Sequence, residues 1–168
     1  MNSTLAAWNM ADDAEALDAM MACCGSKRWA ASMVALRPIG NVVELSEAAD
    51  RVWGALQEPD WLETFACHPR IGERKAGAAG QSAVWSKQEQ ARTSTASERV
   101  LAEIAEDNVL YEERFGFTYI VCATGKSADE MLAILKRRLA GTREAELREA
   151  AEQQRQIMQI RLGKWLVE

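Results

Sequence analysis

One stretch of this 168-residue sequence has the composition of a buried β-strand, and it stands alone. The stretch is FTYIVCA, residues 117–123, which is apolar and contains β-branched residues. A lone strand has no sheet to join, and even an isolated pair of strands is only marginally stable in water. The sequence therefore predicts an all-α fold in which residues 117–123 form a buried extended segment between helices.

Capping residues and apolar periodicity predict helices along most of the remaining chain. Asn9 is a suitable N-cap for a helix that ends near Cys24, and Ser26 for a helix that ends before Pro38. Ser127 and Glu130 form a capping-box pattern. The other expected helices cover residues 41–56, a short stretch that begins at Pro59, a segment after Ser86, and residues 96–115 and 143–167.

Two of these helices carry apolar stripes that include polar residues. The first stripe comprises Leu101, Ile104, Asn108, Tyr111 and Phe115. The second comprises Leu147, Ala151, Gln154, Met158, Arg161 and Trp165. A charge on such a stripe needs a partner, so Arg161 either pairs with an acidic group or reaches the surface. Asn108 has a simpler explanation, which is a hydrogen bond to a backbone group.

Composition and length limit the function. Residues 1–168 are expected to form a single domain, with no repeat or linker. The formal net charge of −5 gives no sign of a basic face for nucleic acid. No apolar run approaches the roughly 18 residues that span a membrane, and the N-terminus does not resemble a secretory signal. Neither nucleic acid nor a membrane is therefore expected as a partner.

The four cysteines, Cys23, Cys24, Cys67 and Cys122, form no C-x-x-C pair. With one histidine in the chain, the usual Cys/His zinc sets are excluded, and no metal is expected. Four reduced, mostly buried thiols are typical of a cytoplasmic protein. Cys67 precedes the histidine, but sequence neighbours point apart in regular structure, which argues against a nucleophile–base pair.

The single histidine, His68, lies just before a Gly-rich stretch, residues 69–84, that is predicted to be a loop. Long loops of this kind are often functional, and histidine titrates near neutral pH. A half-buried histidine bonded to backbone is the alternative.

The segment WSKQEQ, residues 85–90, leaves a similar choice, because Ser86 and Glu89 fit a capping box that needs no further role. TGKS, residues 124–127, is no phosphate-binding loop, because Ile120 occupies the position of its first glycine.

Four blocks of the sequence are together similar to one known family. They are HPRIGE at 68–73, WSKQEQ at 85–90, RFGFTYIVCATGKS at 114–127 and the closing helix. In order and spacing they resemble the 2-oxo-4-hydroxy-4-carboxy-5-ureidoimidazoline (OHCU) decarboxylases of uric acid breakdown. The resemblance covers nearly the whole chain. One departure is Thr118, where the family often has proline.

The resemblance implies an all-α enzyme without cofactor or metal, often a homodimer, that converts a small anionic ureide, OHCU, into (S)-allantoin and CO2. It places catalytic roles on His68 and Glu89. The substrate-binding positions that it implies are Pro69, Ser86, Gln90, Ile120, Val121, Cys122, Ala123, Thr124 and Arg161. The C-terminal KWLVE is not a peroxisomal tripeptide, which fits a bacterial, cytoplasmic enzyme.

The chemistry of this substrate agrees with the residues available. The departing carboxylate leaves a carbon next to a ring C=N bond, which can accept the electrons and so replaces a cofactor. One His and one Glu suffice for the proton transfers, and Arg161 can hold an anionic group. Two other functions remain open on the residues alone: a hydrolase of a related ureide, and a helical binding module without enzymatic activity.

Overall fold

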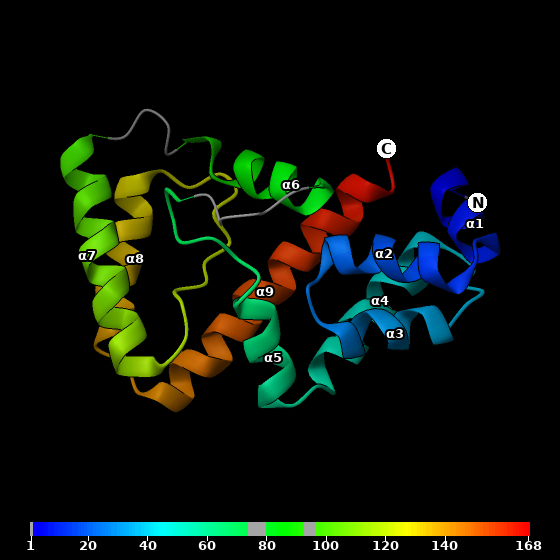
Figure 1. Cartoon of the computed structure of the whole chain (residues 1–168), viewed down its shortest axis with the longest axis horizontal. Helices are drawn as coiled ribbons and strands as arrows, with labels where there is room; N and C mark the ends of the chain where they lie inside the picture. The colour runs from blue at the N-terminus through cyan, green and yellow to red at the C-terminus, as the bar shows by residue number, and fades with distance from the viewer. Residues whose placement is uncertain (1, 74–79, 93–96) are drawn as a thin grey trace. The chain divides into compact units, whose positions relative to one another are not determined.

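The structure is a computed structural model that describes residues 2–73, 80–92 and 97–168. Within these ranges the chain forms nine α-helices and no strand, which confirms the all-α prediction (Figure 1). In chain order the helices are α1 Ser3–Met10, α2 Asp13–Cys23, α3 Lys27–Ala35, α4 Val42–Gly54, α5 Glu58–Phe65, α6 Gln81–Glu89, α7 Glu98–Phe115, α8 Ala128–Leu139 and α9 Arg143–Trp165.

The first of two compact units contains residues up to Thr64 together with the end of α9 from Arg155. Its core includes the buried side chains of Trp8 and Trp29, whose indole N–H groups donate to the backbone oxygens of Ala16 and Ala49. Trp8 also packs edge-on against Trp165. A buried indole is stable when its N–H is paired, so these tryptophans serve as core residues.

The second unit, residues 65–154, contains α6, α7, α8 and the start of α9. Helices α7 and α8 pack against each other. Between them, residues 117–123 are neither helix nor strand, and all of their side chains except that of Thr118 are buried. Around this segment five aromatic rings form a cluster of neighbouring contacts, comprising Phe65, Tyr111, Phe115, Phe117 and Tyr119. The prediction of a buried non-helical segment is thus confirmed.

Two predicted caps are confirmed. The Ser26 side chain accepts a hydrogen bond from the first turn of α3, and Ser127 with Glu130 forms a complete capping box. The Asn41 side chain caps α4 in the same way. Gly116 ends α7 in the left-handed conformation, with a φ of 82° that favours glycine. The polar members of both predicted stripes, Asn108, Gln154 and Arg161, are buried as their positions indicated.

Two predicted helix starts are wrong. The segment from Asn9 to Cys24 is two helices, because Ala11 is extended and Asp12 caps α2, while the Asn9 amide pairs with the backbone of Ile39. The helix expected after Ser86 begins at Gln81 instead. Only Trp85 and Glu89 of α6 are buried, so this helix has no apolar stripe by which its start could be recognised.

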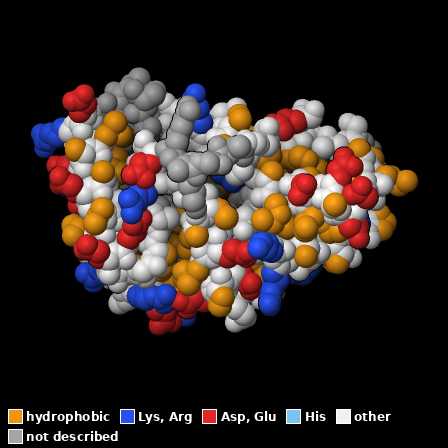
Figure 2. Space-filling view, viewed as in Figure 1, with side chains coloured by type: hydrophobic (Ala, Val, Ile, Leu, Met, Phe, Trp, Pro, Cys, Tyr) orange, Lys and Arg blue, Asp and Glu red, His pale blue; other side chains and the backbone are white. Residues whose placement is uncertain are grey.

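The surface carries mixed charges. On the face drawn in Figure 2, Lys and Arg side chains lie among Asp and Glu side chains and do not form a continuous basic patch. None of the helices within the described ranges is both long and apolar enough to cross a membrane.

Candidate active site

His68 follows the end of α5 in a tight turn of the second unit. Its backbone N–H donates to the carbonyl oxygen of Phe65 at 3.1 Å, which reverses the chain after the last helical residue. The imidazole Nε2 lies 2.5 Å from Oε1 of Gln154 on α9. His68 is half-buried, whereas Gln154 is completely buried. The alternative interpretation was a histidine bonded only to backbone. The contact with Gln154 shows that a side chain also holds the ring.

The chain after His68 is fixed at two further points. Arg70 makes a bidentate contact with Glu112 of α7, with Nε to Oε1 at 2.9 Å and Nη2 to Oε2 at 2.5 Å. Hydrogen bonding to this guanidinium lowers the pKa of Glu112, although partial burial acts in the opposite direction. Two residues on, the Gly72 N–H donates to Oε1 of Gln90 at 2.9 Å. Residues 68–72 are thus attached to α6, α7 and α9.

The predicted site residues of α6 lie at the end of that helix. Ser86 is one turn before Gln90, whose N–H donates to the Ser86 carbonyl. Glu89 is the last helical residue, and only 9% of its surface is exposed. The capping-box interpretation of Ser86 and Glu89 is therefore wrong, because that motif belongs to a helix start. A buried carboxylate at this position requires a different explanation.

The segment Ile120–Thr124 is buried over its first four residues, and Thr124 is exposed. Several of its backbone groups already have protein partners. The Cys122 N–H donates to Oε1 of Gln153, and the Cys122 carbonyl accepts from Lys126 Nζ. The Cys122 N–H is therefore engaged within the protein, and the substrate-binding roles of residues 120–124 stay predictions.

Arg161 lies on α9 within the first unit, and only 3% of its surface is exposed. Of the two alternatives for this charge, the one in which Arg161 reaches the surface is therefore excluded. Within that unit, burial raises the pKa of the Cys23 thiol to about 12. The positive charge of Arg161 acts in the opposite direction and lowers this pKa. Cys23, Cys24 and Cys122 are buried, and only Cys67 is exposed.

Three residues that hold His68 or the chain just after it were not identified from the sequence. Gln154 carried a usable signal, because it is an amide in the same apolar stripe that identified Arg161. Arg70 and Glu112 carried none, since they are 42 positions apart and each is an ordinary surface residue type. A contact between distant charged residues becomes visible only once the chain is folded.

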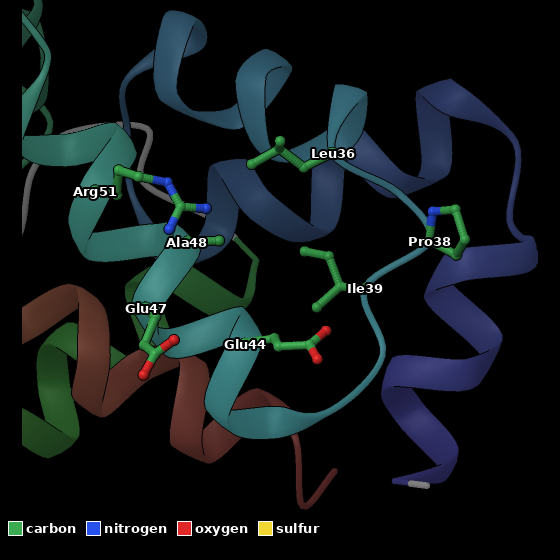
Figure 3. Close-up of a pocket in the computed structure, with 7 residues that line it drawn as sticks. All are labelled: Leu36, Pro38, Ile39, Glu44, Glu47, Ala48 and Arg51. Carbon is green, nitrogen blue, oxygen red and sulfur yellow. The ribbon is translucent and has the colours of Figure 1, made fainter.

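A small cavity of about 190 Å³ opens elsewhere, in the first unit (Figure 3). It is lined by Leu36, Pro38, Ile39, Glu44, Glu47, Ala48 and Arg51. The Glu44 carboxylate accepts hydrogen bonds from the Gly40 N–H and the Asn41 side-chain amide at the start of α4. No predicted site residue lines this cavity, and its Glu44 carboxylate is engaged at the start of α4.

Comparison with known proteins connects this arrangement with a reaction. The model of the OHCU decarboxylase family matches residues 9–163. The chain belongs to the OHCU decarboxylase family. It is 26% identical over 162 residues to the 2-oxo-4-hydroxy-4-carboxy-5-ureidoimidazoline decarboxylase of Haloferax volcanii. The aligned region covers 96% of this chain and 95% of that protein.

Two further similarities support the family assignment. A solved structure of OHCU decarboxylase in the presence of (S)-allantoin superimposes with a TM-score of 0.78 at 32% identity, covering 94% of this chain and 100% of that one. The bifunctional uric acid degradation protein TTL of Arabidopsis thaliana is 36% identical over 149 residues. The match covers 88% of this chain but 46% of the plant protein, so the chain spans about half the length of that relative.

Proposed function

We propose that this chain converts OHCU into (S)-allantoin and CO2, with His68 and Glu89 as the proton-transferring groups. The observation that carries the proposal is the family match over residues 9–163, which contains both residues. The position of Glu89 adds support, because a buried carboxylate at the end of a helix has no capping role to explain it.

The reaction needs three things from the protein. It must hold the anionic substrate, shield the developing charge from water, and deliver a proton to one face of the C=N carbon next to the carbon that loses CO2. The electrons of the broken C–CO2 bond flow into the adjacent C=N bond, whose nitrogen takes up a proton. The hydroxyl on the decarboxylated carbon then loses its proton and becomes a carbonyl, while the former C=N carbon gains a proton, which leaves a neutral product. We assign the proton transfers to His68 and Glu89, and the grip on an anionic group to Arg161, whose planar guanidinium suits bidentate binding.

The remaining assignments complete the proposal. Pro69, Ser86, Gln90 and the Ile120–Thr124 segment would shape the substrate pocket. A homodimer is expected from the family resemblance and a cytoplasmic location from the four reduced cysteines, and light scattering on the purified protein tests the dimer.

The direct test follows OHCU itself. Fresh intermediate is generated from urate by oxidation and hydrolysis, and CO2 release and the optical activity of the product are recorded with and without this protein. Only a decarboxylase accelerates both CO2 release and formation of (S)-allantoin. A hydrolase of a related ureide would consume substrate without faster CO2 release, and a binding module would leave the spontaneous rate unchanged.

A further inference from the structure

Gln154 occupies a costly position for a glutamine. It is completely buried on α9, where its neighbours along the apolar stripe include Ala151 and Met158. Its Oε1 contacts Nε2 of His68 at 2.5 Å. Its Nε2 has no hydrogen-bond partner within the described part of the chain. An unsatisfied buried amide group is destabilising, so packing alone would favour an apolar side chain here.

We propose that Gln154 is a positioning residue for His68. This inference rests on the proposed function, in which His68 transfers protons. Because Oε1 can only accept, the contact places a proton on Nε2 of the imidazole and leaves the lone pair of the neutral ring on Nδ1. The same contact fixes the rotation of the ring. A histidine held in this way presents the same nitrogen to each substrate molecule, as outer partners of functional histidines do elsewhere.

Two substitutions separate positioning from packing. Gln154→Met keeps the length of the side chain but removes the acceptor, so turnover should fall about 10- to 100-fold, the usual effect of losing such a partner. Its melting temperature should not fall, because the unsatisfied amide is also removed. Gln154→Glu keeps the acceptor and should retain more turnover than Gln154→Met. Its carboxylate should also raise the pKa of His68 by about one unit or more.

The single histidine allows a readout that does not depend on activity. In ¹H–¹⁵N spectra of the untagged protein every imidazole signal belongs to His68. The wild type should show a proton on Nε2 that is protected from exchange, and Gln154→Met should lose this protection. The pKa of His68 in Gln154→Glu is measured in the same way. The charged group nearest in sequence, Arg70, is paired with Glu112 and is unchanged in both variants.

Matched controls are provided by Gln57, an exposed glutamine of the first unit. Gln57→Met and Gln57→Glu make the same chemical changes and should leave turnover and the His68 signals as in the wild type.

The outcomes distinguish this inference from the proposed function. If Gln154→Met keeps both the protected Nε2 proton and wild-type turnover, the positioning role is overturned and the decarboxylase proposal stands. If the proton is lost but turnover is unchanged, the contact holds the ring without serving catalysis, so the positioning role is overturned and the decarboxylase proposal again stands. Should Gln154→Met fail to fold, an unshifted pKa of His68 in Gln154→Glu would still overturn the inference.

Discussion

Two groups of buried polar side chains in the second unit differ in how completely they are paired. In the first group Arg138 donates to Glu146 at 2.8 Å and to the Ile120 carbonyl at 2.6 Å, while the Tyr111 hydroxyl donates to Glu146 at 2.7 Å. In the second group Gln154 and Asn108 each bond one neighbour, His68 and Glu112, but each leaves one buried polar atom without a partner among the described residues.

The difference indicates different roles. Complete pairing of a charged group is what a folded core requires, and it explains why Arg138 is tolerated at 5% exposure. Burial also raises the pKa of Tyr111, which therefore stays protonated and keeps donating to Glu146. Incomplete pairing costs stability, and it occurs at residues next to His68 and to the Arg70–Glu112 pair. We infer that the first group serves the fold, whereas the second serves the site.

The largest expected effect tests the site. His68→Asn should lower turnover by about 10²- to 10⁴-fold, the usual contribution of a positioned acid or base. The melting temperature should stay close to that of the wild type, because His68 is only half-buried. Steady-state decarboxylation and thermal unfolding are measured on the same preparation. Near-normal turnover of the folded variant would contradict a catalytic His68.

The second prediction tests the fold. Arg138→Met leaves the buried carboxylate of Glu146 without its counter-charge, so the free energy of unfolding should fall by about 3–5 kcal/mol. Urea denaturation measures this change. Arg137→Met, one position earlier on the exposed face of α8, is the control and should change stability little. The double variant Arg138→Met/Glu146→Leu should recover most of the loss. If the double variant is no more stable than Arg138→Met, the loss of stability does not arise from the unpaired Glu146 carboxylate.

The third prediction concerns Glu89. Glu89→Gln keeps the shape of the side chain but cannot take up a proton, so turnover should fall by at least about 10²-fold at an unchanged melting temperature. The matched control is Glu113→Gln, which removes one negative charge from an exposed position on α7. Decarboxylation by Glu89→Gln within a few-fold of the wild type would defeat the catalytic assignment.

The sequence predicted the fold well where the signals were local. The predicted caps Ser26 and Ser127 act within one turn of their own position. The all-α class followed from the isolation of residues 117–123, which is a property of the whole chain. The start of α6 could not be predicted, because that helix has neither a side-chain cap nor an apolar stripe.

The site was predictable only in part. The resemblance pointed to His68 and Glu89 directly, but the contacts that hold His68 and Arg70 come from Gln154 and Glu112, far along the chain. Such contacts depend on how helices pack, and no local pattern encodes them. The capping-box interpretation of Glu89 failed for a related reason, because S-x-x-E fits a helix start and a helix end equally well when the apolar pattern is weak.

The fourth prediction extends the comparison to Arg161, a buried charge on the same stripe as Gln154. Arg161→Lys keeps the positive charge but loses the planar fork, so a substrate-binding role predicts a higher KM or lower turnover, by about tenfold for a loss of about 1.4 kcal/mol. Steady-state kinetics with OHCU measure both parameters. Kinetics like those of the wild type would leave Arg161 as a structural residue of the first unit.

The smallest expected effect concerns the Arg70–Glu112 pair, which is partly exposed. The pKa of Glu112 is lowered below its ordinary value of 4.5, chiefly by hydrogen bonding to Arg70. A carboxyl whose pKa is lower in the folded state stabilises the protein above its unfolded pKa, and this contribution is lost as the pH falls through the folded value. Wild-type protein should therefore melt slightly higher than Arg70→Gln at pH 7, and the difference should shrink as the pH is lowered below about 4.5. A difference in melting temperature that stays constant between pH 7 and pH 3 would show that Arg70 stabilises the loop by packing and not through the charge of Glu112.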